Sequence, residues 1–466
     1  MNKIATFHPS FKGRIGVARV DITPPMGIYA RNWGAAAHDV ADSIHRPLML
    51  TAITFLSPGR ARPLVLINAD LGWWRSPALF QGFQKRLLEA FGLDASSLIF
   101  ALTHTHSAPA LVPPGLSLPG SDMLEAYRGQ VLDAAVDAVG RAIENAKGAV
   151  LDWNRGKCLL ARVRDLPDPD PRGNRMLCGY NPAVEADDTL YFGRVTDEAG
   201  GVRATIVNYA CHPTTLAWQN TAISPDFVGA MRETVEAATG AAPALFLQGA
   251  SGELAPRYQY VGDPAVADRH GRHLGHAALA ALEDMEPPGT RLVFDRAVES
   301  GAPLAVWRHE PVEPSSRLAA LQTSVEVPLK RWPSAEELEQ QRAACHDRAL
   351  EERLRRKRDV RRALGDGDTY RLPVWIWQIG DAVLVGSMAE AYSLLQRQLR
   401  SRFPERSILC LNLINGSIAY LPPKELYDAN VYQVWQTPFD RGSLEMVIDA
   451  LAESIHRILT SRDSGP

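Results

Sequence analysis

The chain has 466 residues, of which 46% are hydrophobic and 22% charged, and its formal net charge is −3. Such a chain can bury a large core, and its nearly balanced charge excludes nucleic acid or a membrane surface as the expected main partner. Five cysteines occur without a C-x-x-C pair, which is typical of a reducing compartment. No run of about 18 apolar residues occurs, so we expect a cytoplasmic protein without stable membrane insertion.

Strand-like and helix-like segments alternate along the chain. Strands are expected at 15–20, 50–55, 63–68, 98–103, 203–209, 244–247, 374–379, 382–386 and 408–413. Helices are expected at 77–91, 122–146, 226–238, 264–283, 334–364, 389–401 and 443–459. This alternation predicts an α/β protein with a mixed β-sheet core flanked by helices. We expect one domain over residues 1–466.

One segment, at about 333–366, differs in composition and is expected to be a charged helical insertion. It begins with a capping box, Ser334 as N-cap and Glu337 three residues later, and becomes strongly basic over 353–362. We expect one long solvated helix whose basic end complements the helix dipole. The segment is interpreted as an insertion or a contact in a homo-oligomer.

The stretch "SLIFALTHTHSAP" places two histidines directly after an apolar run. If the strand continued, His104 and His106 would face the same side, because residues two apart on a strand share a face. Two imidazoles in one space can hold a metal or pair a ligand with a proton donor. A hydrogen-bonded pair in a loop is the alternative.

Polar residues follow other apolar runs, and strand ends are where ligands collect in α/β sheets. His104 and His106 could therefore converge with His212, Glu390 and Tyr420. Each of the last three also has a structural explanation: His212 as a turn residue, Glu390 as a carboxylate at a helix start and Tyr420 as an aromatic at the edge of the core.

Five motifs, "VDITPP", "THTHS", "NYACHP", "SPDF" and "GASGELAP", occur in this order, and the similarity runs from about residue 16 to about residue 432. Together they resemble the neutral/alkaline, non-lysosomal ceramidase family, zinc amidases that cut the N-acyl bond of ceramide. The resemblance implies a neutral-ceramidase-like catalytic domain in which His104 and His212 ligate Zn²⁺ and His106 donates to the substrate. It further implies Glu390 in "GSMAE" and Tyr420 in "GSIAYLPP" as the remaining ligands.

The chemistry of these side chains agrees with that implication. Two imidazoles, a carboxylate and a phenol oxygen suit zinc and leave a position for water or a substrate carbonyl. Zinc lowers the pKa of bound water to about 7, so amide hydrolysis by zinc-activated water is expected. His106 would then serve the oxyanion or the leaving amine as the catalytic donor.

The chain departs from the family at Ala255, where the family carries a serine. Ser251 lies in "GASGE", which is not a G-x-S-x-G elbow, so we interpret it as structural and assign Glu253 to holding the loop. We also expect the family's further C-terminal domain to be absent. We therefore expect a small-molecule or lipid-like amide as substrate, with long-chain ceramide a poor one.

Two alternatives remain open: a zinc esterase or lactonase acting on a small soluble substrate, and a non-catalytic zinc-binding relative. Arg31 and Arg175 are candidate substrate contacts, because a guanidinium fork suits a carbonyl or carboxylate. Asp226 is expected to cap the helix that follows it. The remaining histidine group is expected to be solvated rather than metal-binding, and comprises His270, His273 and His276.

Overall fold

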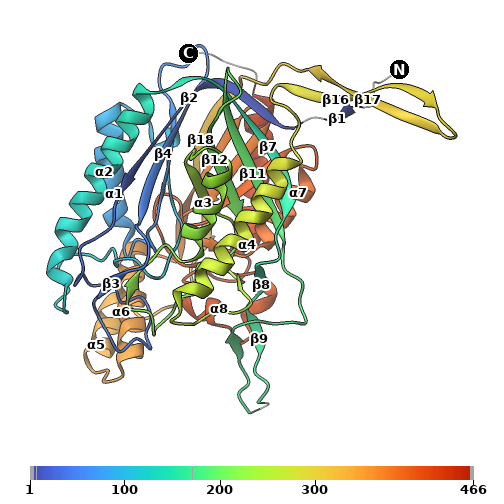
Figure 1. The fold of residues 1–466 in the computed structure, drawn as a ribbon. Helices are drawn as coiled ribbons and strands as arrows, with labels where there is room; N and C mark the ends of the chain where they lie inside the picture. Colours follow the sequence, from blue (N-terminus) through green and yellow to red (C-terminus); the bar gives the residue numbers. More distant parts are fainter. Residues whose placement is uncertain (1–4, 7, 171, 462–466) are drawn as a thin grey trace.

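The computed structural model describes residues 5–6, 8–170 and 172–461, so both ends of the expected domain lie outside the described residues. Its centre is formed by two mixed β-sheets (Figure 1). The larger sheet contains, in spatial order, β14 (Ala244–Gln248), β12 (Val202–Tyr209), β11 (Thr189–Asp197), β7 (Lys147–Lys157), β2 (Ser10–Asp21), β4 (Met49–Leu56), β5 (Leu64–Ala69) and β6 (Leu98–Leu102). The smaller contains β18 (Leu318–Pro328), β19 (Thr369–Ile379), β20 (Ala382–Ser387) and β22 (Ser407–Leu411).

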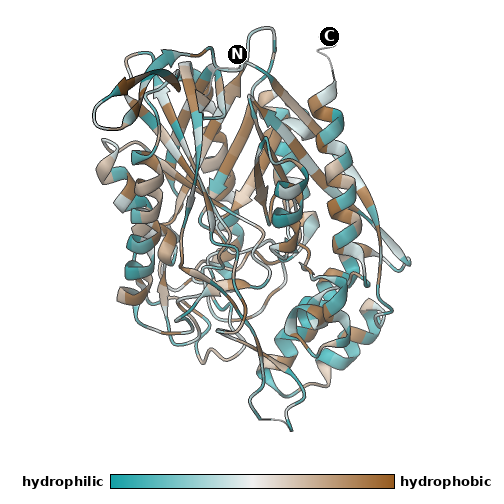
Figure 2. Cartoon of the chain, turned by 90° about the vertical axis from the view of Figure 1, so that its right-hand side faces the viewer, coloured by the Kyte–Doolittle hydropathy of each residue, from teal (hydrophilic) through white to brown (hydrophobic). Residues whose placement is uncertain are grey.

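The two sheets share one apolar core, in which Phe55 and Leu66 of the larger sheet pack in the same cluster as Trp377 of the smaller. Their strands are largely hydrophobic, as the brown ribbons of Figure 2 show. Helices cover the other faces through separate apolar clusters, and these helices are α1 (Pro77–Phe91), α2 (Leu124–Glu144), α3 (Phe227–Ala238), α4 (Pro264–Glu283), α7 (Leu394–Arg402) and α9 (Ser443–Thr460). The predicted α/β class with a mixed sheet flanked by helices is confirmed.

The larger sheet curls so that strands from its two ends lie side by side. Asn68 of β5 donates from its side-chain amide to the Phe246 carbonyl of β14 at 2.7 Å and accepts from the Phe246 N–H at 3.1 Å. A buried asparagine of this kind replaces the ladder hydrogen bonds that an edge strand lacks. The curl brings together the loops that follow β6 and β12.

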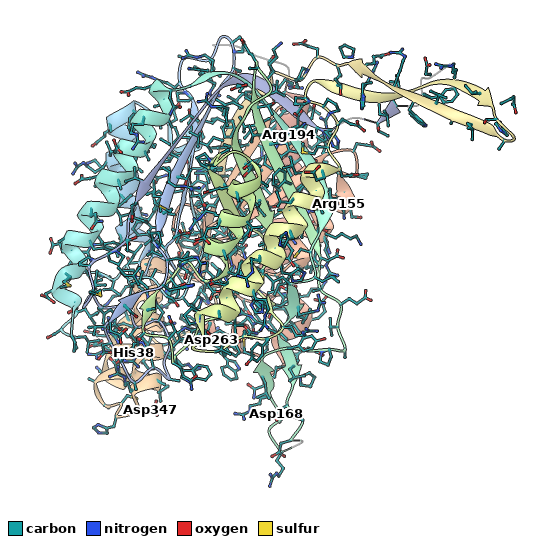
Figure 3. The ribbon with its side chains drawn as sticks, viewed as in Figure 1. His38, Arg155, Asp168, Arg194, Asp263 and Asp347 are labelled. Carbon is teal, nitrogen blue, oxygen red and sulfur yellow. The ribbon has the colours of Figure 1, made fainter. Side chains whose placement is uncertain are left out.

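The charged segment forms two helices, α5 (Ala335–Ala343) and α6 (Arg348–Leu364), so the expectation of one long helix is wrong. Asp347 starts the second helix, because its side chain accepts a hydrogen bond from the Leu350 N–H at 2.7 Å. The expected capping box at Ser334 and Glu337 is present. Asp347 lies at the lower left of the molecule in Figure 3.

The expectation that this segment is solvated is wrong for one face of α6. Glu352 is buried and pairs with Arg75, Arg355 and Arg356. The Arg356 guanidinium also donates to the Asn32 carbonyl at 3.0 Å. The ion pair with Arg75 and the hydrogen bond to Asn32 therefore hold α6 against the body, which amphipathic periodicity alone does not reveal.

Short elements complete the described chain. A sheet of β1 (Ala5–Thr6), β16 (Thr290–Glu299) and β17 (Pro303–Pro311) projects from the body at the upper right of Figure 1. The other short strands, 3-10 helices and one helix are β3 (Ser43–Ile44), β8 (Ala161–Val163), β9 (Asp165–Pro167), β10 (Met176–Cys178), β13 (Ala222–Ile223), β15 (Leu254–Pro256), β21 (Glu390–Ala391), β23 (Tyr420–Leu421), η1 (Ala95–Ser97), η2 (Ser121–Met123), η3 (Lys424–Asp428) and α8 (Tyr432–Gln436). The five cysteines are free thiols. Within the described ranges, no helix has both the length and the apolar character needed to cross a bilayer.

Candidate metal centre

His104 and His106 lie beyond the end of β6, which stops at Leu102. His104 has a φ of 69°, so the chain turns there and strand alternation does not orient the two rings. They nevertheless meet, with ring centroids 4.8 Å apart and their Nε2 atoms 3.4 Å apart. The predicted shared space is therefore confirmed, although a strained turn rather than a strand face produces it.

Glu390 and Tyr420 are directly paired residues of a two-stranded parallel sheet, β21 with β23. These short strands follow β20 and β22, which are themselves parallel neighbours in the smaller sheet. The expected helix from 389 begins instead at Leu394, and Glu390 is not a carboxylate at a helix start. The strands that follow β20 and β22 thus place the Glu390 carboxylate and the Tyr420 phenol on neighbouring residues of one small sheet.

Backbone carbonyls fix the orientation of the two buried imidazoles. His104 Nδ1 lies 2.8 Å from the Gly72 carbonyl oxygen, and His212 Nδ1 lies 3.2 Å from that of Leu254. Since a carbonyl oxygen can only accept, each Nδ1 carries the proton. In the neutral form of each ring, Nε2 is then the unprotonated nitrogen and can act only as an acceptor or a metal ligand.

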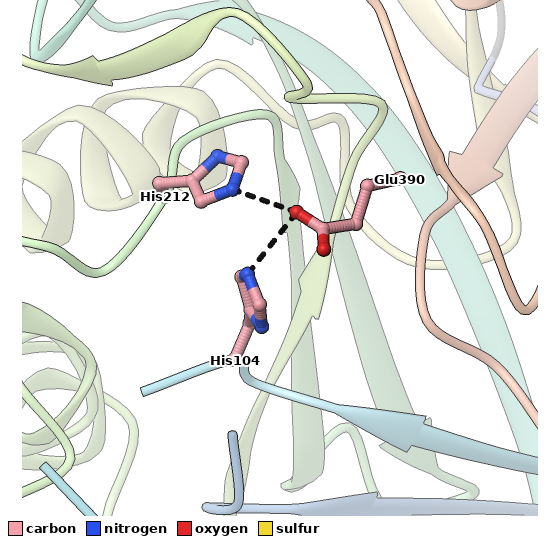
Figure 4. Close-up of side chains that lie close together, drawn as sticks. All are labelled: His104, His212 and Glu390. Carbon is pink, nitrogen blue, oxygen red and sulfur yellow. Dashed lines mark hydrogen bonds and ion pairs between the residues drawn. The ribbon is translucent and has the colours of Figure 1, made fainter. Parts of the chain in front are cut away.

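The two Nε2 atoms converge on one carboxylate, as Figure 4 shows. Glu390 Oε2 lies 3.0 Å from His212 Nε2 and 3.3 Å from His104 Nε2. One ligand atom from each of these three buried residues lies within 4.8 Å of the others. The structure thus brings together three of the four predicted metal-ligating side chains around one point.

The protonation states of this group suit a cation. Burial, together with the nearby Arg164, lowers the pKa of His212 to about 3 although Glu390 opposes the shift. Burial raises the pKa of Glu390, but the charges and hydrogen bonds of His104 and His212 lower it well below its ordinary value. A neutral imidazole and an ionised carboxylate are the forms that bind metal.

A metal ion fits these residues. Two imidazole lone pairs and a carboxylate are all acceptors, and acceptors that face one another in a buried space need a cation between them. The carbonyl contacts of the Nδ1 atoms are the outer contacts that orient metal-binding histidines. Nitrogen and oxygen donors of this kind suit zinc.

Tyr420 lies beside this group and contacts the guanidinium of Arg164, a residue that the sequence motifs did not indicate. Its ring is stacked on His212 with centroids 6.3 Å apart, and its hydroxyl accepts from Arg164 at 3.2 Å. Burial and then Glu390 raise the pKa of Tyr420 well above its ordinary value. The phenol is therefore protonated in the metal-free chain, with Arg164 opposing that shift.

Arg164 directly follows β8 and is the main site residue that sequence reasoning missed. Its guanidinium lies 3.3 Å from His212 Nε2 and donates to the Gly252 carbonyl at 2.8 Å. It stands in no recognisable motif, and only the tertiary fold brings it to Tyr420. A buried guanidinium at this point can stabilise negative charge that develops in the site.

His106 borders the group and opens toward a cleft. Its ring lies 4.9 Å from that of Trp73 and 5.0 Å from that of Trp33, measured between centroids. Burial, with His104 and His212, lowers its pKa well below the ordinary value, and its buried Nδ1 has no hydrogen-bond partner among the described residues. The cleft is lined by His104, His106, Glu390 and Tyr420 as well as by aromatic and charged side chains.

Two candidate substrate contacts lie elsewhere. Arg31 is buried, and its guanidinium donates to the carbonyls of Trp33, Gly34 and Arg348 rather than lining this cleft. Arg175 pairs with Asp168 at 2.8 Å on the projecting β9–β10 hairpin, where Figure 3 shows Asp168. Each guanidinium already binds other groups of the protein through hydrogen bonds or an ion pair, and sequence spacing could not indicate this.

The remaining expectations concern supporting residues. Asp226 caps α3 as predicted, and its carboxylate also accepts from the Leu216 N–H. Glu253 holds its loop through the Ser393 N–H and hydroxyl, and burial raises its pKa to about 7. His273 and His276 are exposed as expected, whereas His270 is half-buried and contacts the Thr215 hydroxyl.

The chain has the fold of neutral ceramidase structures. A structure described as a ceramidase complexed with C2 superposes with a TM-score of 0.67 over 97% of this chain and 76% of that one, at 17% identity. The neutral ceramidase of Pseudomonas aeruginosa superposes with a TM-score of 0.64 over 96% and 74%, at 18% identity. No protein-family model matches the chain, and no curated protein does.

Proposed function

We propose that the protein is a zinc-dependent hydrolase that cleaves an amide (N-acyl) bond with water. The observation that carries this proposal is the convergence of two oriented imidazole Nε2 atoms on the Glu390 carboxylate. The cleft beside them and the likeness to ceramidase structures support it. The five free thiols are consistent with the proposed cytoplasmic location.

His104, His212 and Glu390 would hold the metal, with Tyr420 as the fourth ligand. Zinc bound there would supply a Lewis acid and a water molecule of lowered pKa. The ligands leave the cleft side open, so a small-molecule or lipid-like amide could approach from that side.

Two further side chains would act on the substrate. His106 is neutral, and its Nδ1 has no hydrogen-bond partner in the described part of the chain, so the ring can donate one hydrogen bond to the carbonyl oxygen or hold a proton for the leaving amine. Arg164 brings a fixed positive charge next to the Tyr420 hydroxyl. Both would favour the transition state, in which negative charge accumulates on the former carbonyl oxygen.

Turnover of a substrate panel tests this function. The panel contains N-acyl amines, N-acyl amino acids, lactams, esters and ceramide, each assayed at neutral pH before chelation, after chelation and after zinc is restored. We expect amide hydrolysis that a chelator abolishes and zinc restores. Faster hydrolysis of esters or lactones would favour the esterase alternative, and a zinc-loaded protein that turns over nothing would favour the non-catalytic one.

A further inference from the structure

The cleft beside the candidate metal centre is built from two parts of the molecule. One part supplies His104, His106, Glu390 and Tyr420, and α6 together with the residues before α5 supplies Trp332, Arg356, Lys357, Asp359 and Val360. A molecule bound in the cleft would therefore touch both the reacting centre and the charged helix. The side chains contributed by α6 then bear on which substrate is accepted.

Lys357 is the cation in this cleft that lacks a carboxylate partner among the described residues. Its ammonium lies 4.4 Å from the centroid of the Trp332 ring, a cation–π contact that holds the side chain in place without neutralising it. Burial and then Arg353 lower its pKa. Burial and, to a smaller extent, Lys357 lower the pKa of Lys330, although Asp440 opposes this shift. An anion bound beside Lys357 would offset the cost of burying its charge and the cost of holding it near other cations.

The other charges lining the cleft are already matched. Arg75 and Arg356 share the Glu352 carboxylate, at 3.2 Å and 2.8 Å. Asp359 accepts two hydrogen bonds from Arg358, at 2.7 Å and 2.9 Å. Glu390 faces the histidines. Glu352 also pairs with Arg355, which has Glu351 as a second carboxylate partner. Lys357 is therefore the cation of this lining whose charge is left unmatched among the described residues.

Apolar surface surrounds this charge. Trp73, Trp332 and Tyr432 line the cleft with their rings, and Val360 and Ile418 add aliphatic surface. An amphipathic molecule with one negative group fits this lining better than a neutral lipid does.

We infer that the substrate is an amide carrying a carboxylate near the scissile bond, as in an N-acyl amino acid, and that Lys357 binds this carboxylate. The inference rests on the proposed function and names its substrate class. Hydrolysis breaks the C–N bond and adds one water molecule. The water oxygen forms a new bond to the acyl carbon, which becomes a carboxylate, and the nitrogen takes up the protons and leaves as an ammonium. A singly charged carboxylate suits a lone ammonium that shares its cleft with Asp359.

The test compares an N-acylglycine with the N-acylglycinamide of the same acyl group, which differs only in its charge. For the zinc-loaded protein we expect kcat/KM to be at least about tenfold higher for the carboxylate, a difference of about 1.4 kcal/mol. Lys357→Gln should raise KM for the N-acylglycine and so remove most of that preference, while kcat/KM for the N-acylglycinamide should change little. Lys357→Arg should retain it, and added salt should weaken it.

Arg362→Gln is the matched control, because it removes one positive charge from the same helix at an exposed residue outside this cleft. It should keep the wild-type preference. Equal turnover of the two amides, or equal loss of preference in Lys357→Gln and Arg362→Gln, would overturn the inference while leaving amide hydrolysis intact. Preference for an N-acylaminoalkyl phosphate over the carboxylate would overturn the assignment of the anion.

A failure of the proposed function is distinguishable from these outcomes, since it would appear as no zinc-dependent turnover of any amide. Calorimetric titration of the zinc-loaded protein with the N-acylglycine then tests the anion site by itself. Binding weakened about tenfold by Lys357→Gln and unchanged by Arg362→Gln supports the site. Equal binding to all three proteins would refute it.

Discussion

Glu390 Oε2 lies 3.0 Å from His212 Nε2 although the two residues are 178 positions apart in the chain. Glu390 belongs to the short strand β21, which follows β20 of the smaller sheet, and His212 belongs to the loop after β12 of the larger sheet. The contact therefore depends on the packing of the two sheets and on the curl fixed by Asn68. Its geometry is that of two metal ligands rather than of a solvated ion pair, because His212 donates from Nδ1 to a carbonyl instead.

His106→Ala should keep the metal and lose activity. The side chain borders the convergent group, but His104 and His212 are the residues whose Nε2 atoms face Glu390. Removing a donor to the transition state lowers kcat by on the order of 100-fold while the ligands stay in place. Steady-state kinetics and elemental analysis of the same preparation check this. Loss of zinc in this variant would make His106 a ligand.

A serine-reactive phosphonate should not label the protein. Ser251 is fully buried, and its hydroxyl accepts a hydrogen bond from the Gln248 amide at 2.8 Å. Ala255 has no hydroxyl that could attack the substrate. If water attacks instead, no acyl-enzyme forms. Mass spectrometry of the treated protein should show an unchanged mass, whereas a chelator abolishes turnover. An adduct at Ser251 would refute water attack.

Glu352 should make the free energy of unfolding depend on pH. Burial raises its pKa, but Arg356, Arg75 and Arg355 lower it more, to about 2, which is below the ordinary 4.5. A depressed carboxylate pKa stabilises the fold fully above about pH 4.5, and this stabilisation is lost as the pH falls toward about 2. The free energy involved is on the order of 3 kcal/mol.

Denaturant unfolding of wild-type and Glu352→Gln proteins across pH 2 to 7 measures this contribution. The difference between their free energies of unfolding should be largest near neutral pH and should shrink below about pH 4.5. Glu336→Gln, at an exposed position on α5, should follow the wild type. A difference between wild type and Glu352→Gln that is independent of pH would show that Glu352 is not held by its arginines.

Several elements were predictable because local signals define them. Helices were expected at 77–91 and 264–283, and α1 and α4 have these bounds. Each starts with a proline after a capping Ser76 or Asp263, and Gly92, with a φ of 58°, ends α1. That His104, His212 and Glu390 could converge is indicated by the apolar strand that precedes each of them, whereas their role as a ligand set is implied by the family resemblance.

Other features depend on contacts between distant segments. Arg164 reaches His212, Gly252 and Tyr420 across 48, 88 and 256 positions, and no local pattern encodes such contacts. The break between α5 and α6 depends on Asp347, whose capping role competes with an otherwise continuous helical pattern. The buried face of α6 likewise depends on Arg75, which lies 277 positions from Glu352.

The zinc content of the purified protein tests the central claim most directly. Wild-type protein should carry about one zinc per chain, and His212→Ala should lose it, because removing a ligand opens the site. The exposed His276 provides the control, and His276→Ala should keep the metal. Absence of any transition metal from wild-type protein after zinc supplementation, or equal zinc in His212→Ala and His276→Ala, would contradict the account.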